Sequence, residues 1–265
     1  MAVVNTARPN VTLTTDLGLE DNYVGIVKGV ITALNHRAHI IDISHTVPPF
    51  AVTAGRYLLE TAYRSFPPGT VHVAVVDPGV GTARDAVVIE TDDYFFVGPD
   101  NGLFSFLAKG DISGVTAITR RKYLAREITP TFHGRDIFAP VAGFLTLGIA
   151  PAEFGPPRKS LVDLPSARTR MKNGDFIGGV IYIDHFGNLV TSLQGELLPA
   201  ADLLVFVNDI QVGRLRKTFG SVPVGRPVCY VNSFGYVEIA VREGSAARHF
   251  GVDYDSKAQI LIAPL

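Results

Sequence analysis

The pattern of apolar residues changes once along this chain of 265 residues, and that change limits the folds open to it. Up to about residue 150, short runs rich in β-branched residues alternate with longer segments whose apolar side chains recur at helical spacing. Beyond about residue 170, only short strand-like runs remain, separated by turn residues. We therefore expect an α/β domain over residues 1–165 and an all-β domain over residues 170–265.

The first part predicts an open α/β sheet covered by helices on both faces. Val71–Val76 is nearly continuous in apolar character, which is typical of a buried parallel strand. Ala86–Thr91 and Tyr94–Gly98 predict a hairpin across two aspartates. The remaining strands are expected at Val11–Asp16, Ile40–Ser44 and Val115–Thr119, and helices at Asp21–Leu34, Ala51–Phe66 and Asp136–Gly148.

A segment from Pro151 to Arg170 is expected to link the two domains, since it holds four prolines and four basic residues. The strands after it are short and leave little room for a helix, so a small β-barrel or a sandwich is predicted. These strands are expected at Phe176–Asp184, Leu189–Leu193, Leu203–Val207, Gln211–Leu215, Val228–Val231, Tyr236–Val241 and Ile260–Ala263.

The charge and cysteine content narrow the partners and the compartment. Lys and Arg number 24 against 25 Asp and Glu, so the chain lacks the positive excess of a nucleic-acid binder and we expect no nucleic-acid partner. A single cysteine excludes an internal disulfide framework and a cysteine-based zinc site, and it permits a reducing compartment. Without an apolar stretch of about 18 residues or a signal-like N-terminus, we expect no membrane partner and a cytoplasmic location.

Three polar clusters, Thr14–Gly18, Asp77–Arg84 and Thr131–Asp136, follow expected strands or lead into an expected helix. Ligands of α/β sheets bind beyond the carboxyl ends of the strands, so these clusters form the candidate site. The glycines of the second cluster do not predict a dinucleotide site, because the third glycine of such loops is absent and a proline intrudes.

Each polar residue of these clusters also has a structural interpretation when it is taken alone. Asp16 and Asp136 stand where they could cap the helices that follow. Arg84 could be a surface or ion-pair residue, and His133 could be a hydrogen-bonded structural histidine. No single residue of the clusters therefore identifies a function.

Asp77, Arg84 and His133 indicate more when they are taken together, since all three are expected at one edge of the same sheet. An aspartate, a histidine and an arginine in a partly desolvated cleft can orient and deprotonate a water molecule. A zinc site is the competing hypothesis. The histidines form no His-x-His or His-x-x-x-His pair, although His36 and His39 are three apart, so we expect no metal.

Two glycine turns in the second part, Ile183–Asn188 and Tyr230–Tyr236, each combine polar side chains with an aromatic residue. Ordinary hairpin chemistry explains them, since glycine turns with Asn and Asp are common. The functional interpretation is a polar pocket with an aromatic ceiling, suited to a purine and an amino-acid head group. The spacing of the residues does not decide between the two.

Seven short motifs occur in order along nearly the whole chain. They are Thr15–Gly18, His45–Phe50, Val75–Gly81, Gly98–Gly102, Thr131–Asp136, Phe186–Asn188 and Asn232–Tyr236. This set resembles the S-adenosyl-L-methionine (SAM) hydrolases that form adenosine, also called SAM hydroxide adenosyltransferases. They belong to a superfamily with the SAM-dependent chlorinases and fluorinases.

The resemblance implies an N-terminal α/β domain, a C-terminal β-barrel and a homotrimer. It implies a SAM site between the N-terminal domain of one subunit and the C-terminal domain of its neighbour. SAM would be the substrate and adenosine a product, with no cofactor.

The same resemblance implies that Asp77, Arg84 and His133 are the catalytic set of the hydrolytic members. Halogenating members carry tyrosines at the positions of Asp77 and His133, and Gly134 stands where a halide contact is expected.

The resemblance also implies which residues contact SAM. Asp16 would bind the ribose hydroxyls, and Phe50 stands where halogenases use a tryptophan. Phe234 departs from the halogenases, which carry an arginine there, in the region of the methionine carboxylate. The full set of implied substrate-binding residues is Asp16, Phe50, Phe132, Asp184, Phe186, Asn188 and Ser233.

The expected reaction is substitution at C5′ of SAM by water or hydroxide, which releases adenosine and L-methionine. Arg84 would lower the pKa of the bound water, and His133 would hold or accept its proton. Asp77 would orient the pair or act as the base itself. Two alternatives are a non-catalytic SAM or adenosine sensor and a SAM-dependent chlorinase.

Overall fold

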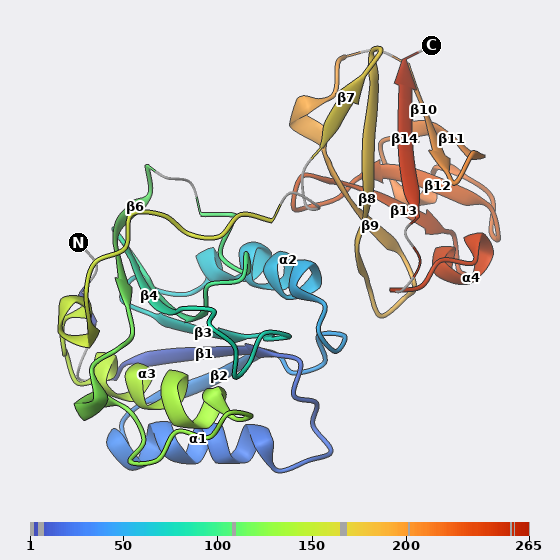
Figure 1. The fold of residues 1–265 in the computed structure, drawn as a ribbon. Coiled ribbons are helices and arrows are strands. Elements are labelled where there is room, and N and C mark those ends of the chain that lie inside the picture. The colour runs from blue at the N-terminus through green and yellow to red at the C-terminus, as the bar shows by residue number, and fades with distance from the viewer. Residues whose placement is uncertain are drawn as a thin grey trace. The chain divides into compact units, whose positions relative to one another are not determined.

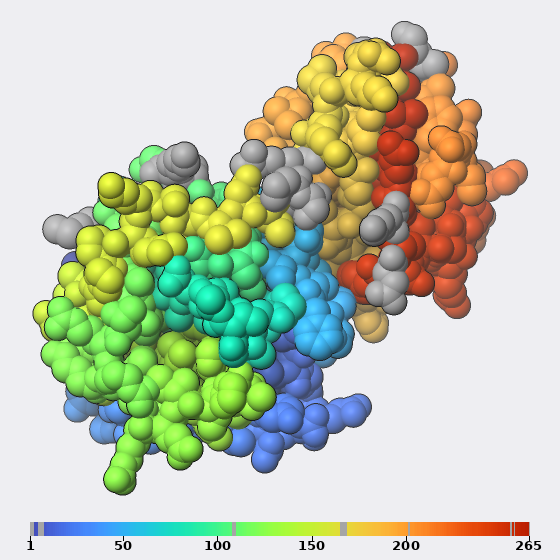
Figure 2. Space-filling view, viewed as in Figure 1, coloured from blue at the N-terminus to red at the C-terminus, as the bar shows by residue number. Residues whose placement is uncertain are grey.

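A computed structural model of the chain divides into two compact units, Met1–Asp163 and Leu164–Leu265 (Figure 1). The structure describes residues 3–4, 8–107, 110–164, 169–200, 202–254, 256 and 258–264. Pro165, where we expected the first domain to end, lies outside the described residues. Each unit has its own hydrophobic core, and side chains fill the spaces between the ribbons of each (Figure 2).

The described residues of the first unit form a six-stranded sheet in the order β2-β1-β3-β5-β4-β6. β1 pairs in parallel with β2 and β3, and β3 pairs in parallel with β5, whereas β4 is antiparallel to both neighbours. The predicted α/β sheet and its β4–β5 hairpin are therefore confirmed. The strands are β1 Asn10–Thr15, β2 His39–Ser44, β3 Val71–Val75, β4 Ala86–Thr91, β5 Phe95–Pro99 and β6 Ile112–Ala117.

Helices cover both faces of this sheet, with α1 (Tyr23–Leu34) and α3 (Ala139–Thr146) on one face and α2 (Val52–Ala62) on the other (Figure 1). α1 and α3 pack against each other. The helix expected at Asp136–Gly148 begins differently from the prediction, because a π-helical turn, Gly134–Phe138, precedes α3. A π-helical turn is a feature often found at functional sites.

The first part of the predicted linker belongs to the first unit instead. Pro151–Phe154 forms a turn of 3₁₀ helix, and Phe154 is fully buried in the first core. Pro157 forms a β-bridge with Thr116, and the backbone N–H of Ala117 donates to the Pro156 carbonyl at 2.9 Å. Burial of one large apolar side chain thus outweighs the prolines, and the linker prediction is wrong up to this point.

The second unit contains a closed β-barrel, as the second half of the sequence predicts. Its described strands pair in the order β14-β10-β11-β12-β13-β9-β8-β7, and a further β14–β8 pairing closes the ring. Its helix α4 (Ala246–Phe250) is short. The strands are β7 Arg170–Lys172, β8 Asp175–Ile183, β9 Leu189–Gln194, β10 Leu203–Val207, β11 Ile210–Arg216, β12 Pro227–Val231, β13 Tyr236–Val241 and β14 Gln259–Pro264.

The observed strands of the barrel agree with the predicted ones to within about two residues, apart from β7, which was not expected. Short apolar runs rich in β-branched residues and bounded by turn residues, as at Leu203–Val207 in β10, explain why the strands could be located. Among the described residues, we find no helix with the length and apolar character needed to cross a membrane.

Candidate active site

A cavity of about 250 Å³ lies beyond the carboxyl ends of β1 and β3 in the first unit. It brings together residues from all three polar clusters of the sequence. The lining includes Asp16, Phe50, Asp77, Phe132, His133 and Gly134.

Asp77 and Arg84 form an ion pair at this edge of the sheet. Asp77 follows β3 and Arg84 precedes β4, which runs in the opposite direction to β5, so both residues lie at the same edge. Arg84 Nε donates to Asp77 Oδ1 at 3.0 Å and to Oδ2 at 2.9 Å, and Nη2 also contacts Oδ2. The side chains are only 6% (Asp77) and 10% (Arg84) exposed, so the pair is shielded from water.

His133 joins this pair through Arg84. Arg84 Nη2 donates to His133 Nδ1 at 2.7 Å, and a guanidinium can only donate. Nδ1 is therefore the acceptor, which leaves the proton of the neutral ring on Nε2. Burial lowers the pKa of the His133 imidazole, and the neighbouring Arg84 charge lowers it further.

Asp16 approaches the same cavity from the turn after β1. Its Oδ2 accepts a hydrogen bond of 2.9 Å from the backbone N–H of Phe50. Burial raises the pKa of the Asp16 carboxyl, and the Asp77 charge acts in the same direction. The helix-cap interpretation is wrong, because Asn22 occupies the N-cap of α1.

Phe50 has a left-handed backbone, with φ of 65°, and this conformation lets its N–H meet Asp16 while its side chain is exposed. A large residue in this region of φ and ψ is strained, and such strain is concentrated at functional sites. Phe50 thus belongs to the cavity through its backbone as well as through its ring.

Asp136 is a support for the His133 loop and not the helix cap that the sequence predicted. The side chain is 1% exposed and lies within the π-helical turn. Oδ2 accepts from Thr129 N at 2.8 Å and from Thr129 Oγ1 at 2.6 Å, and Oδ1 accepts from Arg135 Nε at 2.6 Å. Burial opposes ionisation, but the hydrogen bonds from Arg135 and Thr129 prevail and lower the pKa of Asp136.

Sequence reasoning missed Tyr23 as a site residue. Its ring packs edge-on against Phe132 with 5.3 Å between the centroids, and it lines the cavity. The helical spacing of apolar residues assigned Tyr23 to the core side of a helix. Its place at the first residue of α1, next to the aspartate turn, is the signal that could have identified it.

The two glycine turns of the barrel share one conformation. Asp184 Oδ1 accepts from the amides of Phe186 at 2.9 Å and Asn188 at 2.8 Å. Asn232 Oδ1 accepts in the same way from Phe234 at 3.0 Å and Tyr236 at 3.1 Å. These contacts are the hairpin chemistry that was one of the two sequence interpretations.

Each turn carries a phenylalanine two residues after its Asp or Asn acceptor. The exposed fraction is 73% for Phe186 and 54% for Phe234. The turns lie at opposite ends of the β9–β13 pairing, since Leu189 pairs with Ile239 and Gln194 with Tyr236. That is about 10 Å along β13. The barrel therefore holds Phe186 and Asn188 at one end of this pair, and it holds Ser233 at the other.

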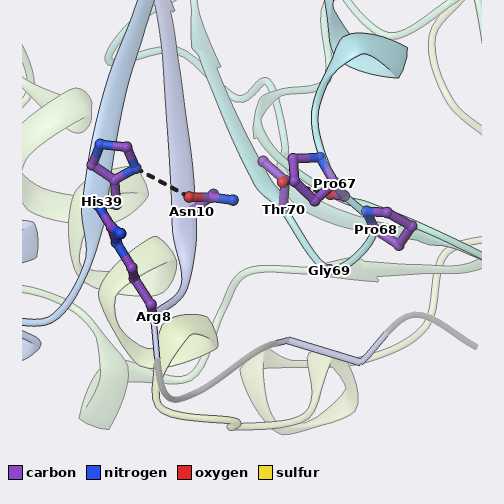
Figure 3. A pocket seen from close by; sticks show the side chains of 7 residues that line it. All are labelled: Arg8, Asn10, His39, Pro67, Pro68, Gly69 and Thr70. Atoms are coloured by element: carbon purple, nitrogen blue, oxygen red, sulfur yellow. Dashed lines mark hydrogen bonds between the residues drawn. The ribbon is translucent and has the colours of Figure 1, made fainter.

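Another hollow lies at the amino ends of β1, β2 and β3, away from the candidate site (Figure 3). His39 Nδ1 lies 3.2 Å from Asn10 Oδ1 there, and Arg8 is the charged side chain of the lining. Among its described lining residues, we find no carboxylate beside the histidine. In the described parts of the chain, we find no group of three or more His, Cys, Asp or Glu side chains arranged to hold a metal ion.

Comparison with known families decides the relationship of the chain. Residues 11–155 match the SAM hydroxide adenosyltransferase N-terminal domain, and residues 178–259 match the C-terminal domain of the same family. The chain belongs to the SAM hydroxide adenosyltransferase family. The family predicted from the seven motifs is thereby confirmed.

Relatives of this family member carry the name (R)-S-adenosyl-L-methionine hydrolase. The Salinispora tropica protein is 40% identical over 92% of this chain and 94% of its own length, and the Thermus thermophilus protein is 38% identical over 93% and 97%. A fluorinase from Actinopolyspora mzabensis is more distant, at 27% identity. A solved structure of an uncharacterized conserved protein from Thermotoga maritima has a TM-score of 0.84 and 36% identity, and the match covers 96% of this chain and 99% of that one.

Proposed function

We propose that this protein hydrolyses SAM by attack of an activated water molecule at C5′, giving adenosine and L-methionine. The observation that carries the proposal is the buried Arg84 side chain bonded to both Asp77 and His133 beside the cavity. The names of the hydrolase relatives, which are 33–40% identical, support the same reaction.

The chemistry of SAM explains why Asp77, Arg84 and His133 suffice for this reaction. The sulfonium of SAM already leaves as a neutral thioether, so no acid is needed to protonate the leaving group. The protein must instead supply an oxygen nucleophile in line with the C5′–S bond. The Arg84 charge favours developing hydroxide over water, and the low exposure of the pair strengthens that effect.

The hydrogen bond between Arg84 and His133 supports Asp77 rather than His133 as the base. With Nδ1 accepting from Arg84, neutral His133 presents Nε2–H and can orient the water by donating to its oxygen. Asp77 retains lone pairs beside its bonds to Arg84 and accepts the proton as the C5′–O bond forms and the C5′–S bond breaks. Asp77 is then the base, and His133 positions the nucleophile.

The substrate contacts follow from the cavity and from the resemblance. Asp16 binds the ribose hydroxyls, with Phe50 and Phe132 beside the nucleoside. In the barrel, Phe186, Asn188 and Ser233 form contacts to adenine, ribose and the methionine carboxylate. Asp184 supports its own turn in this proposal, since it accepts bonds from the backbone amides of Phe186 and Asn188 and from the Asn188 side chain.

Assembly and compartment are part of the same proposal. The resemblance supports a homotrimer in which the barrel of a neighbouring subunit completes each SAM site. The protein uses SAM and water as substrates without a further cofactor. The cytoplasmic location stays a prediction from the cysteine content.

Incubation of the purified protein with SAM in oxygen-18 water tests the reaction. We expect one label in the 5′-hydroxyl of adenosine, detected by mass spectrometry, and loss of adenosine release in Asp77→Asn. Formation of 5′-chloro-5′-deoxyadenosine in high chloride would instead identify a chlorinase. Stoichiometric binding of SAM without turnover over many hours would identify a sensor.

A further inference from the structure

His45 opens one of the seven motifs, and the proposed reaction gives it no role. Its side chain is only 2% exposed, and it lies behind the turn that carries Asp16. Nδ1 lies 2.8 Å from Thr15 Oγ1, and Thr15 is the residue directly before Asp16. The imidazole therefore contacts the side chain of the last residue of β1, directly before the turn that carries Asp16.

The second nitrogen of the ring, Nε2, lies next to a carboxylate. Nε2 lies 3.0 Å from Asp42 Oδ1, in a contact bent away from ideal hydrogen-bond geometry, and Asp42 Oδ2 accepts from Lys28 Nζ at 2.6 Å. A carboxylate favours the proton on Nε2, which leaves Nδ1 to accept from the Thr15 hydroxyl. Thr15 Oγ1 can then accept from the Leu17 amide at 3.3 Å.

Backbone bonds join the same two segments. The Gly18 amide donates to the His45 carbonyl at 2.8 Å, and the Val47 amide donates to the Thr15 carbonyl at 3.3 Å. Further along, the Phe50 amide donates to Asp16 itself. The Asp16 turn and the segment after β2 are therefore joined by several hydrogen bonds, and the His45 side chain lies between them.

His72 shows what a structural histidine looks like in the same sheet. It is fully buried, and its Nδ1 lies 2.7 Å from Thr12 Oγ1, so it repeats the contact between histidine and threonine. Among the described residues, the Nε2 atoms of both histidines lack a hydrogen bond of good geometry, but His45 Nε2 lies 3.0 Å from a carboxylate, whereas the neighbours of His72 are aromatic rings such as Phe96, with centroids 5.1 Å apart. The acidic partner and the proximity to the cavity distinguish His45.

We propose that His45, oriented by Asp42, is a positioning residue that fixes the Asp16 carboxylate for the ribose hydroxyls of the nucleoside substrate. This inference rests on the proposed function. It assigns to the Asp42–His45–Thr15 chain a part in substrate recognition and none in the chemical step.

Two substitutions of His45 test the contacts of its two ring nitrogens one at a time. Asn places its amide near the position of Nδ1, and Gln places its amide near that of Nε2. His45→Asn keeps the contact to Thr15, and we expect its KM for SAM to stay within about threefold of the wild type. His45→Gln loses that contact, and we expect about a tenfold higher KM with kcat within about twofold.

Binding of two nucleosides, measured by calorimetry, tests whether the effect passes through Asp16. His45→Gln should weaken adenosine about tenfold and leave 2′,3′-dideoxyadenosine unchanged, because the latter lacks the hydroxyls that Asp16 would bind. Asp42→Asn, at a more exposed position, should show the same selectivity with a smaller loss. His72→Gln is the matched control, and it should lower the thermal midpoint without changing the binding of either nucleoside.

Several results would overturn the proposal. A KM unchanged in His45→Gln, or an equal loss of both nucleosides, would leave His45 a structural residue. If the wild type binds adenosine but releases none from SAM, the proposed hydrolysis fails, while the nucleoside comparison still decides the role of His45. A wild type that binds neither SAM nor adenosine would refute both proposals.

Discussion

Arg84 in the first unit bonds to residues 7 and 49 positions away, whereas Asp184 in the barrel bonds to residues two and four positions away. Asn232 repeats the pattern of Asp184 at the same spacing. The polar loops of the sheet are thus held together by contacts between distant segments. In the barrel, the Oδ1 atoms of Asp184 and Asn232 accept bonds within their own turns, although Tyr254 also bonds to the backbone of Ile183 at the start of the first turn.

This difference indicates how the two units divide the work. Long-range contacts bring unlike charges together beside a cavity and leave His133 Nε2–H, the Asp77 lone pairs and Asp16 for a ligand. The barrel turns use their carboxylate and amide oxygens internally and expose phenylalanine rings. We therefore expect the chemical step and ribose binding by Asp16 to depend on the first unit, and the barrel to contribute to recognition only, and substitutions can test that division.

The largest effect is expected at Arg84. Arg84→Met removes the bonds to both Asp77 and His133, and we expect kcat for SAM hydrolysis to fall by roughly 10³-fold, as for loss of a group that stabilises developing charge. Arg84→Lys should recover part of the rate, because it keeps the charge but not the forked geometry. The exposed pair of Arg158 with Asp85 supplies the control, and Arg158→Met should stay within about twofold. Activity above a tenth of the wild type in Arg84→Met would contradict the proposed role.

A smaller loss is expected at Asp136, which supports His133 without touching the cavity. In Asp136→Asn, the amide N–H groups would face the Thr129 donors, so we expect kcat to fall about tenfold and the free energy of unfolding to fall by about 2 kcal/mol. Thr129→Val keeps the backbone donor to Asp136 but removes the hydroxyl donor and the bond that this hydroxyl accepts from Arg135, and it should cost about half as much. Chemical denaturation and steady-state kinetics measure both effects, and unchanged kcat in a destabilised Asp136→Asn would make the residue purely structural.

The contrast between local and distant contacts also explains what could be read from the sequence. The strands were located because burial imposes a local pattern of apolar residues, most clearly at β3. Asp77, Arg84 and His133 were grouped because each follows or precedes such an element. The sequence thus predicted the fold and which polar loops would meet.

The roles of individual polar residues were less predictable. Asp136 stands before an apolar run, as the N-cap residue of a helix would. Its partner Thr129 lies in the loop upstream, and the contact between them forms only in the folded chain. His45 opens one of the seven motifs, but the sequence does not reveal its role, since its partner Thr15 is 30 residues away. Asp184 is a substrate contact implied by the resemblance, and the sequence alone does not reveal that its oxygens accept bonds within its own turn.

The pH dependence of kcat and of the stability of the first unit should follow the protonation of His133. Its lowered pKa keeps the ring neutral at neutral pH, so kcat should stay constant from about pH 8 to 6.5 and decline only in more acidic solution. The unfolded chain takes up this proton first, at its ordinary pKa of about 6.5. The His133 contribution to stability is therefore intact above that pH and is lost as the pH falls through the folded pKa.

Denaturant unfolding of the wild type and of His133→Asn across this pH range measures the contribution of His133 to the free energy of unfolding. Profiles of kcat against pH measure its contribution to catalysis. The difference in unfolding free energy between the two proteins should change in acid and stay level above about pH 7. A wild-type kcat that already falls between pH 8 and 7 would mean that a different group, with a higher pKa, controls the reaction.

The smallest effect is expected at Asp184, and it tests the comparison most directly. The twin turn uses Asn232 at the equivalent position, so Asp184→Asn should preserve both amide contacts and leave KM for SAM within about threefold. Asp184→Ala removes the acceptor and should destabilise the turn by about 1 kcal/mol, measured as a lower thermal midpoint. A carboxylate that paired with the methionine ammonium would behave otherwise, because Asp184→Asn would then raise KM about tenfold with no loss of stability. That outcome would give the barrel a charged contact to substrate and remove the division of work between the two units.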